Sequence, residues 1–186
     1  MKIINEQYDS EKEKYDVLEM LKKSEPKECA DLTLEFEHKA GWTYIKGKCE
    51  HFGFSINYSD VMTDASDLIG FFAEIIHSKE DIAIILDYEG SYPLLYAKNE
   101  DENKVRFVFA HDYKLFNEDI FEYYYYDYEI VCDILICKRK LLSEFYNIFR
   151  SYTLNYDPES LDNLNSEFNP EKALKYLKEI EKFLQN

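Results

Sequence analysis

The 186-residue sequence is poor in the residues that build ligand loops and metal centres. It has five glycines, four prolines, one tryptophan and four histidines. So few glycines argue against a glycine-rich phosphate-binding loop, and GxSxG, HExxH and EF-hand patterns are absent. The histidines are isolated along the chain and the cysteines have no histidine at ligand spacing, so the sequence predicts no metal ligand set and no cofactor.

The four cysteines follow no recognisable motif. Cys29, Cys49, Cys132 and Cys137 contain no CxxC pair. This spacing indicates neither a zinc site nor a disulfide framework. Because free cysteine is among the most buried residue types, we predict four reduced, mostly buried thiols.

Long apolar runs are also missing. No segment approaches the roughly 18 consecutive apolar residues of a membrane span, and the N-terminal residues lack the apolar centre of a signal peptide. We therefore expect a soluble protein located in the cytoplasm.

What the chain has in excess is acid and aromatic side chains. There are 38 acidic against 22 basic residues, which gives a net charge of −16, together with 17 tyrosines and 13 phenylalanines. The apolar content predicts one folded domain spanning 1–186. A strongly negative field repels phosphate backbones and anionic lipid, so it argues against nucleic-acid and membrane binding. It favours either a basic protein partner or solubility alone.

Apolar periodicity predicts alternating helices and strands. Helices are expected over 10–23, 64–79, 138–152 and from Asn169 and Pro170 to the C-terminus, and strands over 31–37, 42–48, 52–58, 82–88, 91–97, 104–110 and 123–137. Pro93 cannot donate to a ladder, so its strand is expected at an edge or at a bulge. The predicted fold is α+β: an N-terminal helix within 1–25, a sheet over 31–137 with one inserted helix, and C-terminal helices over 138–186. The sheet is expected to be mainly antiparallel, with six or seven strands and helices on one face.

The segment FEYYYYDYEI, residues 121–130, is the most unusual stretch. Strict alternation would turn Tyr126 and Tyr128 toward the core and would group Tyr123 and Tyr125 with two acids on a wet face. The predicted contact surface comprises Tyr123, Tyr125, Asp127, Glu129, Glu122, Asp119 and Glu118. Tyrosine offers a large contact area and has few rotatable bonds that lose freedom on binding. Together with the acids, it suits binding to a basic protein. The simpler interpretation is a solvated strand face, and a nucleotide-stacking platform would need the opposite charge.

Other candidate sites have simpler structural explanations. Asp60, Asp64 and Asp67 lie within eight residues and are candidates for acid–base chemistry or magnesium binding, but two of them suit a helix start. A second hypothesis is therefore an enzyme or small-ligand protein with a pocket between helix and sheet near Trp42, Asp60, Asp64 or His111. A third is a homo-oligomeric structural protein that buries an apolar patch on its C-terminal helices. We assign no catalytic residue and do not expect an enzyme.

Several short matches carry a family resemblance. They are Gly41-Trp42, Tyr58-Ser59-Asp60, Asp67-Leu68-Ile69, and the segments 88–98 and 104–109. This arrangement resembles a loose family of small bacterial proteins, some of which are thought to act as immunity proteins in polymorphic-toxin or contact-dependent inhibition systems. The resemblance implies an α+β fold and a cytoplasmic inhibitor.

The resemblance and the charge lead to the same hypothesis. Nuclease toxins must be basic to bind phosphate, so an inhibitor gains attraction by presenting carboxylates in place of phosphates. We expect an acidic cytoplasmic protein that neutralises a basic protein partner, as an immunity protein does for a nuclease-type toxin.

Overall fold

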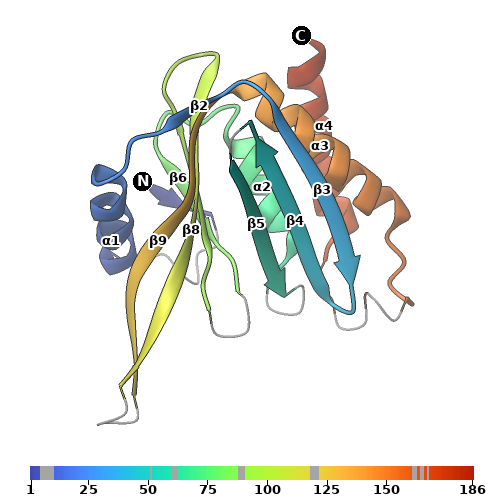
Figure 1. Ribbon diagram of the computed structural model, residues 1–186. Coiled ribbons are helices and arrows are strands. Elements are labelled where there is room, and N and C mark those ends of the chain that lie inside the picture. Colours follow the sequence, from blue (N-terminus) through green and yellow to red (C-terminus); the bar gives the residue numbers. More distant parts are fainter. Residues whose placement is uncertain are drawn as a thin grey trace.

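The computed structural model describes residues 1–4, 11–50, 52–59, 63–87, 91–117, 122–160, 163, 166 and 168–186. For 11–16, 112–117 and 122–127 the description covers the backbone. The protein is α+β, with two sheets and four helices within these residues (Figure 1).

The larger sheet has six strands in the order β1-β6-β7-β8-β9-β2. These are β1 (Lys2–Ile3), β6 (Ile82–Ile85), β7 (Leu94–Asn99), β8 (Lys104–Asn117), β9 (Glu122–Cys137) and β2 (Lys27–Cys29). The central strands are antiparallel, whereas β1 and β2 each run parallel to their single neighbour. The sheet is therefore mixed. Its two outer strands were not predicted, because two or three residues are too few to show an alternating pattern.

The smaller sheet is a three-stranded antiparallel meander. It comprises β3 (Leu32–Lys39), β4 (Trp42–Cys49) and β5 (Phe52–Ser59). The predicted alternation is confirmed on β3, where Leu32 is buried and Thr33 and Glu35 are exposed. The prediction of a mainly antiparallel sheet of six or seven strands is confirmed in part: most pairs are antiparallel, but the strands form two sheets. Alternation identifies a half-buried strand but does not tell which sheet it joins.

Helices cover both faces of the larger sheet. On one face, α2 (Ala65–Glu74), α3 (Lys138–Asn155) and α4 (Pro170–Gln185) pack with the smaller sheet around a phenylalanine core, in which the Phe72 and Phe145 ring centroids lie 3.8 Å apart. On the other face, α1 (Glu11–Lys22) buries Val17 and Leu21 against the sheet (Figure 1). The expected placement of helices on one face is therefore corrected.

Local signals place the helix starts correctly and misplace one strand. The Asp64 side chain accepts a hydrogen bond from the Ser66 backbone N–H, and Asn169 caps α4 by accepting from the Lys172 N–H, with Pro170 in the first turn. Pro93 lies just before β7, which is an interior strand rather than an edge. Because Pro93 precedes the strand, the strand ladder loses no N–H donor. Its carbonyl accepts a hydrogen bond from the Leu86 N–H.

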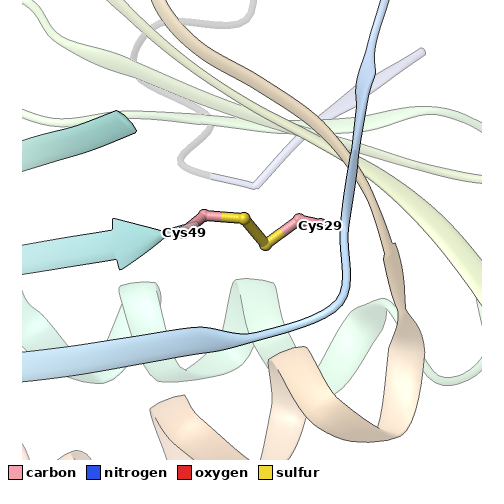
Figure 2. The surroundings of a disulfide bond; sticks show 2 residues. All are labelled: Cys29 and Cys49. Carbon is pink, nitrogen blue, oxygen red and sulfur yellow. A yellow bond between two sulfur atoms is a disulfide. The ribbon is translucent and has the colours of Figure 1, made fainter. Parts of the chain in front are cut away.

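A disulfide joins the two sheets. Cys29 ends β2 and Cys49 ends β4, and the bond between them is buried (Figure 2). The prediction of four reduced thiols is therefore wrong for this pair, while Cys132 and Cys137 are free. The two bonded cysteines are 20 residues apart without a motif, so only their approach in space reveals the bond. No helix in the described part of the chain is long and apolar enough to cross a membrane.

Candidate functional site

Strands β8 and β9 continue beyond the rest of the larger sheet. Strand β7 pairs with β8 only as far as Ala110, and β2 pairs with β9 only at 134–136. Residues 111–117 and 122–129 therefore pair with each other and, among the described strands, with no other. We call these two segments the arm. Figure 1 shows the arm as a two-stranded ribbon that projects from the body of the protein.

The composition of the arm is aromatic and acidic. Its described residues include six tyrosines and one phenylalanine, and four acids against one lysine. The acids are Asp112, Glu122, Asp127 and Glu129, and the lysine is Lys114. Of the predicted contact residues, Glu122, Tyr123, Tyr125, Asp127 and Glu129 belong to the arm, whereas Glu118 and Asp119 lie outside the described residues.

A bulge at the base of the arm changes which face each residue occupies. Phe109 pairs with Cys132, but the next residue of β8, Ala110, pairs with Ile130, so Val131 is an extra residue on β9. Cys132 belongs to the phenylalanine core, whereas Ile130 and Tyr128 pack on the opposite cluster beneath α1. Strict alternation, which predicts Tyr128 on the same core face as Cys132, is therefore wrong at this position.

A second register shift lies inside the tyrosine run. Tyr113 pairs with Asp127 and Lys114 pairs with Tyr125, so Tyr126 is extra. The strict alternation that grouped Tyr123 and Tyr125 with Asp127 and Glu129 is interrupted between these pairs. Of the predicted contact residues, Glu129 is the one whose side chain is described, and it is exposed.

One acid of this region is internal. Asp133 is 8% exposed and receives two hydrogen bonds from Arg106, from Nε at 3.0 Å and from Nη2 at 2.7 Å. The hydrogen bond to Asp133 raises the pKa of Arg106. Arg106 also donates to the backbone carbonyls of Leu21 and Ser24, which fastens the end of α1 to the sheet. Asp133 is thus a structural residue, and it does not belong to the acidic surface of the arm.

His111 has a structural environment at the start of the arm. It is half-buried, its ring lies edge-on to Phe109 with centroids 4.8 Å apart, and it pairs in register with Glu129. Within the described residues, no group of three or more His, Cys, Asp or Glu side chains could hold a metal ion.

Two of the candidate acids have structural partners. Asp64 and Asp67 form ion pairs with Lys172 at 3.4 and 2.6 Å, which ties α4 to the start of α2. Trp42 is half-buried at the start of β4, and Asp60 lies outside the described residues. The exposed large apolar side chains are spread over four elements, so among the described residues they do not mark one oligomer interface; they are Leu18, Val131, Leu154 and Leu174.

A groove of about 580 Å³ lies elsewhere, between β3, the C-terminal half of α3 and the chain that follows it. This groove was not predicted from the sequence. One signal was available: Asn147, Ser151 and Asn155 recur at i, i+4 and i+8 on α3 and all line the groove. Asparagine and serine are poor helix formers, so their recurrence on one face of a helix indicates a role other than helix stability.

Comparisons with known proteins add no relationship. No protein-family model, no curated protein and no solved structure matches this chain.

Proposed function

We propose that this protein is an acidic binding protein that docks onto a basic protein partner through the arm and thereby neutralises it. The observation that carries the proposal is the pairing of β8 and β9 beyond the sheet, in a segment with seven aromatic residues and an excess of acid.

The physics of an isolated ribbon supports this reading. A two-stranded ribbon alone is marginally stable in water, because it has no third layer on which to bury its side chains. Aromatic side chains contribute most when they are fully buried, as they are at the centre of protein interfaces. Tyr128, at the base of the arm, packs beneath α1, and a partner that covers the rest of the arm would supply the missing layer there.

The charge selects the kind of partner. A net charge of −16 draws a basic protein and raises association rates by roughly ten- to a thousandfold at low salt. The same field opposes nucleic acid and anionic membranes. We favour a nuclease-type toxin as the partner and an immunity protein as the role, as the resemblance carried by Gly41-Trp42 and the segments 88–98 and 104–109 implies.

The compartment stays a prediction. The sequence favours the cytoplasm, whereas the Cys29–Cys49 disulfide favours an oxidising environment, since disulfides persist there and are rare in reducing cytosol. If the disulfide is present in the cell, the protein acts outside the reducing cytosol.

The test is to remove the arm. Residues 112–128 are replaced by Asn-Gly, which joins His111 to Glu129, its partner in register. Wild type and variant are each co-expressed with the protein encoded beside this one and purified through a tag. We expect wild type to retain the partner and the shortened protein to lose it, with association falling steeply as salt rises.

A charge-reversal pair provides the matched control. Glu129→Lys changes an exposed acid of the arm, and Glu37→Lys makes the same change at an exposed position of strand β3, away from the arm. We expect Glu129→Lys to slow association several-fold more than Glu37→Lys. Equal effects of the two variants, or a complex that survives arm removal, would show that the arm is not the contact.

A further inference from the structure

The groove at α3 has the size and walls of a small-molecule site, and it is separate from the arm. Its volume of about 580 Å³ lies within the roughly 300–1,000 Å³ usual for such sites. One wall comes from Phe36 and His38 of β3, and the opposite wall from residues 147–157 of α3 and its end. In Figure 1 the arm and the C-terminal end of α3 lie on different sides of the molecule.

An aromatic cluster forms the base of these walls. The Tyr152 ring centroid lies 5.4 Å from that of Phe36, 5.1 Å from that of His38 and 5.9 Å from that of Tyr156. The His38 Nδ1 lies 3.2 Å from the Thr43 hydroxyl, which fixes the imidazole ring. Because three elements hold these rings, the groove offers aromatic surface that does not depend on a ligand for its position.

Asn163 supplies a buried acceptor to this region. It lines the groove and is 8% exposed. Its Nδ2 donates to the Asp157 carbonyl, and because a carbonyl can only accept, this bond fixes which amide atom is the oxygen. The Oδ1 has no hydrogen-bond partner among the described residues. This oxygen is almost fully enclosed by the protein, so a ligand in the groove does not reach it, and Asn163 serves as part of the wall.

The charge of the walls narrows the ligand class. None of the described residues that line the groove is lysine or arginine, and the lining is mostly amide, hydroxyl and aromatic, with one carboxylate, Asp157, whose Oδ1 accepts from the Glu159 backbone N–H. Phosphate and carboxylate ligands would have no cation to pair with. A neutral ligand with several hydroxyl donors and an apolar face matches every one of these groups.

We propose that the groove binds a neutral carbohydrate of one or two sugar units. Ring C–H groups of the sugar pack on the Tyr152 and Tyr156 side of the groove, and hydroxyls bond to the exposed Asn147, Ser151 and Asn155 side chains of α3. Monosaccharides are small ligands, so dissociation constants of about 1 mM are expected.

The test uses ligand-observed NMR with two panels. The first contains glucose, galactose, mannose, N-acetylglucosamine, maltose and cellobiose; the second contains adenosine, inorganic phosphate and trialanine. Ser151→Trp fills the groove from an exposed helix position, and Leu154→Trp places the same side chain on the same helix at a position that does not line it. We expect at least one sugar to bind wild type and Leu154→Trp equally, and Ser151→Trp at least tenfold more weakly.

Asn147→Ala removes an exposed amide that lines the groove and should weaken the same sugar about tenfold, the effect of losing one good hydrogen bond. The proposal is overturned if no sugar of the panel binds, if Ser151→Trp leaves sugar binding unchanged, or if adenosine, phosphate or trialanine binds more tightly than every sugar.

Discussion

At the scale of single residues, two buried polar contacts stabilise the larger sheet. Arg106 of β8 and Asp133 of β9 are diagonal neighbours on paired strands, and their side chains are 14% and 5% exposed. Tyr96 of β7 is buried, and its hydroxyl donates to Asp81 at 2.8 Å. Removing one member of such a contact leaves the other buried without its partner, which costs more than the contact contributes.

Tyr96 provides a pH-dependent test. Burial, together with the hydrogen bond to Asp81, raises the pKa of Tyr96 above its usual range. Because the folded protein holds this proton more tightly than the unfolded chain, unfolding releases it above about pH 10, and stability falls as pH rises. The contribution is at most about 1.4 kcal/mol per pH unit.

We therefore expect Tyr96→Phe to lower the free energy of unfolding by about 1 kcal/mol at pH 7, and by less as pH rises past 10. Urea titrations of both proteins between pH 7 and pH 11 measure this. If the loss in free energy of unfolding caused by Tyr96→Phe stayed constant over that range, the raised pKa of Tyr96 would be contradicted.

At the scale of elements, β9 explains where prediction from sequence succeeds and fails. Its residues from Cys132 to Ile136 alternate as predicted, because the sheet buries one face of that part continuously. The bulge at Val131 and the register shift at Tyr126 have no sequence signal such as glycine. An alternating pattern with a period of two therefore does not reveal them. The arm therefore has the predicted composition without the predicted single face.

The smaller sheet contains a close contact that constrains one glycine. A Cβ added to Gly47 would lie 2.1 Å from the Phe54 ring, which crosses from the paired strand β5. Phe54 is itself buried, with its ring centroid 6.4 Å from each of Phe107 and Phe109, so it has little room to move.

We expect Gly47→Ala to destabilise the protein by about 1–3 kcal/mol through overpacking, measured by urea unfolding. Gly53→Ala is the matched control on the neighbouring strand, because its Cβ would meet only the Gly47 carbonyl at 3.3 Å. A loss at Gly53 as large as that at Gly47 would mean that loss of glycine in a strand, rather than the Phe54 ring, is the cause.

At the scale of the whole molecule, the Cys29–Cys49 bond links β2 of the larger sheet to β4 of the smaller sheet. Closing a loop of this length in the unfolded chain contributes about 3 kcal/mol. We expect the double variant Cys29→Ser/Cys49→Ser to melt several degrees below wild type. Cys137→Ser is the control at an exposed free thiol, and we expect it to melt at the wild-type temperature.

Thiol counting checks the same bond directly. Burial raises the pKa of Cys132 to about 12, so an alkylating reagent at pH 8 should modify Cys137 alone in the folded protein. Mass spectrometry should find two modified cysteines after denaturation and four after denaturation with reduction. Four modified cysteines without reductant would show that the disulfide does not form in solution.

The sequence by itself determined the α+β class, the helix caps at Asp64 and Asn169, and the strands of the β3–β5 meander, because each depends on neighbours a few residues apart. It also determined the net charge and the tyrosine-rich stretch from which the proposed partner follows. The tertiary structure alone decided the division into two sheets, the disulfide, the Arg106–Asp133 pair and the groove at α3. Each of these brings together groups that are distant along the chain, and local patterns carry no information about which distant segments meet.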